Sequence, residues 1–150
     1  MLAVPRRPLA VDVLVQVDAP RLLGPTNWVG RTFPLHASAS GKLVLAELSD
    51  TELEAWSSGA RLERYTRKTI TAPAALRVEV ARARRRGYAV LVDELEEGLA
   101  GIAAAVRAPD GALAAMIGVS GASFRLTAKR RSELIPHILE AAADLGHPTR

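Results

Sequence analysis

Residues 33–48, FPLHASASGKLVLAEL, are the stretch from which the rest of the chain can be interpreted. A short apolar run meets a turn of small residues, Ser38 to Gly41, and the turn opens into a helix. Small side chains at such a junction let another molecule approach the backbone, and a helix start carries N–H groups without partners inside the helix. Two interpretations stay open: a capped structural turn, or one wall of a site for an anionic or carbonyl-bearing ligand.

The composition predicts one folded domain and limits its chemistry. The chain has 150 residues, of which 49% are hydrophobic and only 4% aromatic. This is enough for one core built from Ala, Leu, Val and Ile, with few platforms on which single-stranded nucleic acid could stack. A net charge of +4 permits weak attraction to polyanions without establishing it. The absence of cysteine excludes disulfides, thiolate zinc sites and cysteine nucleophiles.

No stretch has the pattern of a signal peptide or a membrane span. The first 17 residues interrupt their apolar runs with prolines, arginines and an aspartate. The longest later apolar runs are about eight residues, too short to cross a bilayer. We therefore expect a soluble cytoplasmic protein with no membrane partner.

The first part of the chain is expected to hold one strand before the small-residue turn. Residues 1–8 carry two prolines and two arginines and are predicted to be a loose tail. Valines alternate with other residues over 9–18, which is typical of a strand with one buried face. Residues 19–27 are predicted to be a loop, and residues 28–35 a short strand or an extended connection.

Helix signals dominate the middle of the chain. The helix expected after Gly41 leads to Ser49 and Glu52, which have capping-box spacing and predict a second short helix ending at Gly59. Residues 73–87 are predicted to form a third helix, with Leu76, Val80 and Ala83 facing inward, Gly87 as its stop, and Thr69 or Thr71 as its cap.

The last third predicts strands followed by a helix. Strands are expected at 88–92, 99–106 and 113–119, and Asp110-Gly111 predicts a hairpin between the last two. Thr127 is expected to cap a helix that ends near Gly146 and contains Pro136, which should kink the helix or shift its start. Its buried stripe is predicted to be Leu134, Ile138, Ala142 and Leu145. This order of elements suggests α+β with an antiparallel sheet.

No arrangement of residues supports catalysis, a metal or a cofactor. The three histidines are scattered, and His36, beside the turn, is interpreted as structural in preference to ligand-binding. The acidic run at 93–97 is interpreted as a solvated loop in preference to a general acid or metal site. Gly41-Lys42 lacks the glycine and hydroxyl residue that a phosphate-binding loop requires. We therefore expect a protein that is not an enzyme.

Several blocks together resemble the IclR family of bacterial transcriptional regulators. They lie in order, nearly without gaps, between about residue 9 and residue 146. The blocks are VQVDAPRLLGP (15–25), GRTFPLHASASGK (30–42), TITAPAALRVEVARARRRGYAV (69–90) and DELEEGLAGIAAAVRAPDGALAAMIGVSGASFRLT (93–127).

This resemblance implies that residues 9–150 are the C-terminal effector-binding domain of such a regulator. The family's domain is α+β and GAF-like, with a curved antiparallel sheet flanked by helices, and it binds small organic or aromatic acids. Members dimerise through a winged helix-turn-helix and often form tetramers through the effector domain. The chain has no room for that winged helix or for the usual opening helix and strand, so DNA contact would need a part this sequence lacks. A fragment, a misplaced gene start and a natural truncation all stay open.

The resemblance also assigns candidate ligand contacts. They comprise the turn, an apolar wall and the facing strands: Ser38, Ala39, Ser40, Leu91, Gly101, Val119 and Ser120. Three polar anchors of the family are absent, because Leu91 (or Val92 if the register slips), Gly101 and Gly118 replace an aspartate, a cysteine and a serine. A pocket that lacks these groups should prefer a larger, more apolar effector, such as an aromatic acid. The alternative is a non-sensing oligomerisation or interaction module.

Overall fold

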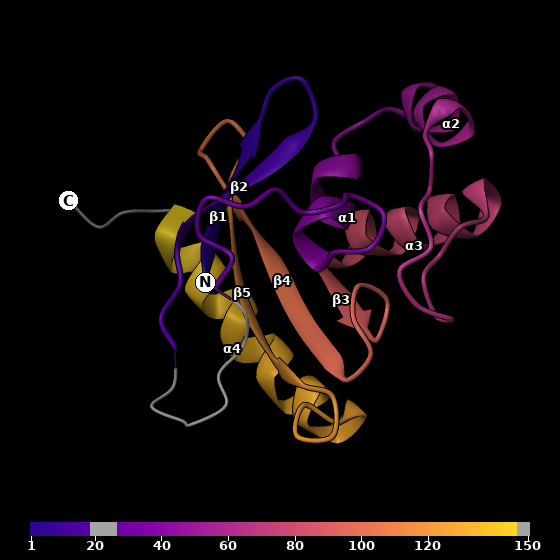
Figure 1. The fold of residues 1–150 in the computed structure, drawn as a ribbon. Coiled ribbons are helices and arrows are strands. Elements are labelled where there is room, and N and C mark those ends of the chain that lie inside the picture. The colour runs from indigo at the N-terminus through magenta and orange to yellow at the C-terminus, as the bar shows by residue number, and fades with distance from the viewer. Residues whose placement is uncertain (19–26, 147–150) are drawn as a thin grey trace.

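The computed structural model describes residues 1–18 and 27–146, which form a five-stranded antiparallel sheet with helices on both faces (Figure 1). The sheet order is β2-β1-β5-β4-β3. The strands are β1 (Leu2–Arg6), β2 (Ala10–Val15), β3 (Tyr88–Val92), β4 (Leu99–Arg107) and β5 (Leu113–Ala122). The helices are α1 (Ala39–Leu45), α2 (Asp50–Gly59), α3 (Pro73–Arg86) and α4 (Ala128–Gly146). The predicted α+β class with a curved antiparallel sheet is confirmed.

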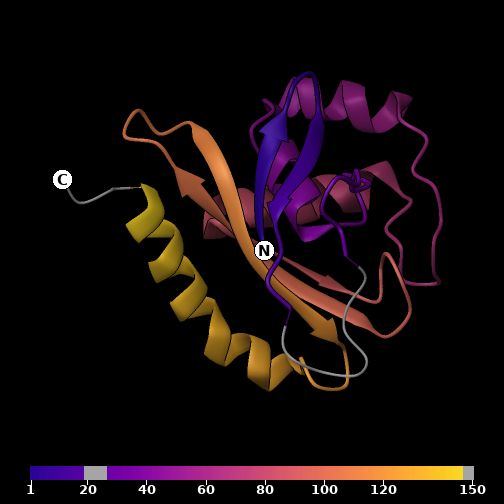
Figure 2. The same cartoon turned by 60° about the vertical axis from the view of Figure 1, so that its left-hand side comes forward.

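The two faces of the sheet carry separate cores. Helix α4 crosses one face, while α1 and α3 cover the other and α2 packs outside them (Figure 2). Beneath α4, Ile102 and Val106 of β4 meet Ile138 and Ala142. The larger core joins α1, α2 and α3 to the other face of the sheet and includes residues from all five strands. The candidate site lies on the α1 side of the sheet.

The prediction of a loose tail over residues 1–8 is wrong. Residues 2–6 form β1, which lies between β2 and β5, and Ala3 is fully buried. Pro5 is tolerated because only Leu2 and Ala3 pair with β5, so the missing N–H of Pro5 breaks no bond to that neighbour. The prolines and arginines concealed a short apolar strand that becomes stable only by pairing with distant residues.

The predicted third helix is confirmed except for its cap. Leu76, Val80 and Ala83 are buried, and Gly87 ends α3 in the left-handed conformation with a φ of 73°. Neither Thr69 nor Thr71 caps the helix, because Ala72 occupies that position and makes no side-chain bond. The Thr69 hydroxyl instead accepts hydrogen bonds from the N–H groups of residues 65 and 66.

The other local signals are largely confirmed. Ser49 and Glu52 form the capping box of α2, and α1 begins at Ala39, two residues before the expected Gly41. Residues 28–31 form a turn and residues 32–35 a connection, whose one ladder contact within the described residues is a bridge from Thr32 to β2. The predicted loop at 19–27 lies outside the described residues apart from Asn27.

The C-terminal half follows its predictions closely. The hairpin between β4 and β5 closes with Gly111 at a φ of 85°, donating its N–H to the carbonyl of Ala108. Thr127 Oγ1 accepts the N–H of Arg130, which confirms it as the cap of α4. Pro136 lies within the helix and does not shift its start. Leu145 was wrongly predicted to be buried, since it is 53% exposed. Within the described residues, no helix is both long and apolar enough to cross a membrane.

Candidate effector pocket

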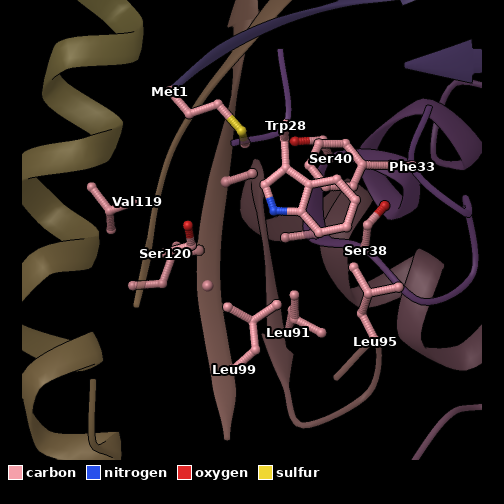
Figure 3. A pocket seen from close by; sticks show the side chains of 14 residues that line it. Met1, Trp28, Phe33, Ser38, Ser40, Leu91, Leu95, Leu99, Val119 and Ser120 are labelled. Atoms are coloured by element: carbon pink, nitrogen blue, oxygen red, sulfur yellow. The ribbon is translucent and has the colours of Figure 1, made fainter. Parts of the chain in front are cut away.

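A small cavity lies where the start of α1 faces strands β3, β4 and β5 (Figure 3). All seven residues predicted from the sequence border it. The lining also includes Met1, Trp28, Phe33, Leu95, Leu99, Ile102 and Ala103. The volume that a water-sized molecule can enter is about 30 Å³. All space not filled by atoms, including the gaps between side chains and the solvent at the mouth, amounts to about 400 Å³. The seven residues therefore lie together around one cavity, and the structure adds the other residues that line it.

Ser38 shapes the turn at the edge of this cavity. Its hydroxyl accepts the N–H of Gly41 at 3.1 Å and donates to the carbonyl of Pro34 at 2.8 Å. Both bonds lie within the turn, so the hydroxyl is occupied in holding it. Ser38 would thus act on a ligand by fixing the positions of its neighbours.

Gly41 allows α1 to start close against the preceding segment. A Cβ at this position would clash with the backbone of Leu35 and with the Ser38 hydroxyl. No residue with a side chain fits there without moving backbone atoms. Ala39 and Ser40, in the first turn of α1, line the pocket, and neither of their backbone N–H groups has an acceptor within the described residues.

Ser40 carries a buried hydroxyl with no partner among the described residues. The residue is 2% exposed, and its oxygen points into the pocket in Figure 3. Every fully enclosed polar side-chain atom of the described residues has a hydrogen-bond partner, so the Ser40 oxygen must border the open space. A hydroxyl that borders open space in an otherwise buried residue is available to a ligand acceptor or donor there.

The strand side of the pocket is mostly apolar. Gly101 faces the cavity without a side chain, and a Cβ there would lie 3.5 Å from the Ser120 Cβ and 3.8 Å from the Leu91 Cδ2. These three residues therefore share one face of the sheet. Val119 lies on the α4 side of β5 in Figure 3, so it borders the pocket through its backbone. Ser120 is exposed and lies at the rim.

Met1, Trp28 and Phe33 close the remaining side, and sequence reasoning missed their role. The Trp28 and Phe33 rings pack with centroids 4.6 Å apart. Met1 reaches the site because its backbone exchanges hydrogen bonds with Gly118 of β5. The sequence offered one hint, a tryptophan two residues before the block at 30–42 that resembles the family. Its place beside the pocket depends on tertiary contacts, which local sequence does not reveal.

A buried ion pair fastens α1 to the loop after β3. Lys42 is fully buried, and its Nζ lies 2.8 and 2.7 Å from the two carboxylate oxygens of Glu94 and 3.0 Å from the Val90 carbonyl. Burial raises the pKa of the Glu94 carboxyl, although Lys42 opposes this shift. The prediction that the acidic run is solvated is therefore wrong for Glu94. The pair links the two walls of the pocket, because Leu95 follows Glu94 directly.

The remaining polar groups near the site have structural partners. The His36 ring bonds to the Glu63 carbonyl at 2.8 Å and stacks on Tyr65, which agrees with the structural interpretation. A second, open cleft of about 370 Å³ is lined by Lys68 and Asp93, which form an ion pair with a 2.7 Å separation. Hydrogen bonding by Lys68 lowers the pKa of the Asp93 carboxyl. Among the described residues, no group of three or more histidines and carboxylates could hold a metal ion.

The fold and this pocket define an α+β domain of the effector-binding class. The chain belongs to the family described as bacterial transcriptional regulator IclR C-terminal, whose model matches residues 6–147. It is 39% identical over 117 residues to the HTH-type transcriptional regulator BhcR of Paracoccus denitrificans, covering 78% of this chain and 42% of that protein. The chain thus spans less than half the length of this curated relative.

Solved structures agree with the family assignment. The protein RHA06195 from Rhodococcus sp. RHA1, described as a transcriptional regulator, superposes with a TM-score of 0.89 at 29% identity, over 97% of this chain and 58% of that one. The inducer-binding domain of the PobR transcription factor from Acinetobacter, a double mutant in complex with 3-hydroxybenzoic acid, gives 0.88 at 22% identity, over 99% of this chain and 87% of that one. The second similarity shows the fold alone.

Proposed function

We propose that this chain is the sensing part of a bacterial transcriptional regulator and that its pocket binds a small acid with an apolar, preferably aromatic, body. The observation that carries the proposal is Ser40, a residue that is 2% exposed and borders the cavity, and whose hydroxyl has no partner in the described residues. Beside it are the N–H groups of Ala39 and Ser40. Together they form a polar end suited to a carboxylate.

The rest of the lining supports an apolar ligand body. Leu91, Leu95, Leu99 and the ring of Phe33 surround the polar end, and within the described residues no charged side chain borders the cavity. Such a site orients its ligand through few polar contacts and holds it by burial. The complex of the PobR inducer-binding domain with 3-hydroxybenzoic acid makes aromatic acids the first class to try.

Binding would act on the regulator by shifting a conformational equilibrium. A ligand favours the arrangement of the domain that binds it more tightly. The size of the shift in the equilibrium is limited by the difference between its affinities for the two arrangements. We propose that this bias passes through a homo-oligomer, a dimer or tetramer, to a DNA-binding part such as the longer relatives carry. We propose from the same relatives that the protein controls transcription inside the cell. These relatives are regulators, so they give no support to an enzymatic role.

The test is titration of the purified chain with a panel of acids, including 3-hydroxybenzoate, benzoate and pyruvate, by calorimetry. We expect at least one aromatic acid to bind and Ser40→Ala to weaken it by about tenfold, as loss of one hydrogen bond in a buried site would do. Ser57→Ala is the matched control, because Ser57 is also buried but its hydroxyl bonds to the Glu54 carbonyl and to Arg77, and it does not line the cavity. The proposal fails if no acid binds at millimolar concentration, or if Ser40→Ala binds like the wild type.

The small free volume favours a second candidate, a non-sensing oligomerisation module. About 30 Å³ holds no more than a water molecule, whereas a cavity of about 150 Å³ is known to admit benzene. Light scattering together with the acid panel separates the two functions. A stable oligomer that binds none of the acids would support the module.

A further inference from the structure

We infer that Trp28 sets the size of the effector pocket: its indole occupies the space that the body of a ligand would take, and binding displaces it. This inference rests on the proposed function and identifies the side chain that decides which acids fit. Figure 3 shows the indole lying among the lining residues, between Met1 and the leucines of the opposite wall. The remaining space, about 30 Å³, is what the indole leaves.

The backbone of Trp28 is held by hydrogen bonds, while its side chain makes none within the described residues. Its N–H donates to Gln16 Oε1 at 3.0 Å, and its carbonyl accepts the N–H of Arg31 at 3.0 Å, closing a turn that contains Gly30 at a φ of 76°. By contrast, the indole N–H has no hydrogen-bond partner among the described residues. The ring contacts Phe33, and the Arg31 guanidinium lies 5.9 Å from its centroid. Rotation of the side chain would therefore break no hydrogen bond in the described part of the chain.

The indole also matches the proposed ligand in kind. It is a flat aromatic body in an apolar site, so an aromatic acid could replace its contact with Phe33 at little cost. Polar anchors would then come from Ser40 and the backbone. Removing the indole should leave a cavity large enough for a free aromatic molecule, as large-to-small core substitutions do.

The first experiment needs no knowledge of the natural effector. Thermal unfolding of Trp28→Ala is followed with and without free indole. We expect this variant to melt below the wild type and to gain thermal stability with rising indole concentration. The wild type and Trp56→Ala should show no such gain, because Trp56 lies on α2, away from the cavity. If indole fails to stabilise Trp28→Ala, or stabilises Trp56→Ala equally, the inference is overturned.

A second variant keeps the test decisive if Trp28→Ala does not fold. Trp56→Phe leaves Trp28 as the single tryptophan, so its fluorescence reports on this ring alone. We expect an acid that binds to move the emission to longer wavelength as the indole leaves its apolar site. An unchanged emission at saturating acid would contradict displacement.

Size selectivity separates this inference from the proposed function. In Trp28→Ala we expect the affinity ratio of 2-naphthoate to 3-hydroxybenzoate to rise by about tenfold or more relative to the wild type. If indole binds in the cavity of Trp28→Ala but neither protein binds any acid, the Trp28 side chain does fill the pocket and the sensing proposal fails. If the wild type binds acids and the ratio does not change, sensing stands and the role of Trp28 is wrong.

Discussion

Neighbouring serines in the turn have different tasks. The Ser38 hydroxyl is occupied by Gly41 and Pro34, while the Ser40 hydroxyl faces the cavity without a partner in the described residues. The sequence presents both as small polar residues, and only their hydrogen bonds tell them apart. A ligand can therefore gain a hydrogen bond from Ser40 at no structural cost, whereas a bond to Ser38 would weaken the cap.

Gly41→Ala tests the close approach that builds the turn. Because its Cβ would meet the Leu35 backbone, which cannot yield like a flexible side chain, we expect a loss of about 1–3 kcal/mol in the free energy of unfolding. Gly59→Ala is the control, since a Cβ there meets nothing within 4 Å. It should be neutral or stabilising by up to about 1 kcal/mol. Chemical denaturation measures both, and equal stabilities for the two variants would contradict the packing described.

Lys42→Met tests the buried ion pair. Removing one partner leaves a carboxylate in a mostly buried site, which costs about 3–5 kcal/mol of unfolding free energy. Lys68→Met is the matched control, because Lys68 is 63% exposed and its pair with Asp93 should contribute about 1 kcal/mol or less. Urea titrations of both variants against the wild type provide the comparison. A loss no greater than that of Lys68→Met would show that the pair does not fasten α1.

The pH dependence of Lys42→Met follows from Glu94. Burial already raises the pKa of this carboxyl, and removal of the lysine raises it further. A raised folded-state pKa favours the folded protein below the unfolded-state value, about 4.3, and this benefit is lost as pH rises through the folded-state value. The deficit of Lys42→Met should therefore be smaller at about pH 5 than at about pH 7.5. A deficit that does not change with pH would exclude Glu94 as its source.

Among the secondary-structure elements, sequence patterns correctly predicted the features that depend on interactions between residues close together in the chain. The capping box of α2, the inward stripe and glycine stop of α3, and the Asp110-Gly111 hairpin each depend on residues close in sequence, and all are confirmed. Strand β1 was missed because its stability comes from β2 and β5, the latter more than 100 residues away along the chain. Trp28 at the pocket and the Lys42–Glu94 pair were missed for the same reason.

Ala3→Asp tests whether β1 is part of the folded sheet. Ala3 is fully buried between two strands, so an added carboxylate would lose its hydration without gaining a partner. We expect a loss of about 2–5 kcal/mol, or failure to fold. Arg7→Asp, at an exposed position, should change stability by about 0.5 kcal/mol or less. Thermal unfolding that placed both variants near the wild type would restore the interpretation of a loose tail.

At the scale of the whole molecule, the seven predicted residues meet because four separate segments converge on one face of the sheet. The resemblance supplied that arrangement, since nothing in the local sequence relates Ser40 to Gly101 or Ser120. The resemblance did not predict the other side chains that line the pocket and reduce its volume. Met1 and Trp28 line the cavity from two parts of the chain in which the sequence predicted no contact with the site.

The central claim is that an acid binds between the turn at the start of α1 and the strands facing it. Two-dimensional NMR of the ¹⁵N-labelled chain, titrated with 3-hydroxybenzoate and benzoate, tests it most directly. We predict saturable shifts of the amide signals of Ala39, Ser40, Gly101 and Ser120, with Ser57 unaffected. Shifts confined to the open cleft around Lys68 and Ser123, or no saturable shift with any acid, would contradict the claim.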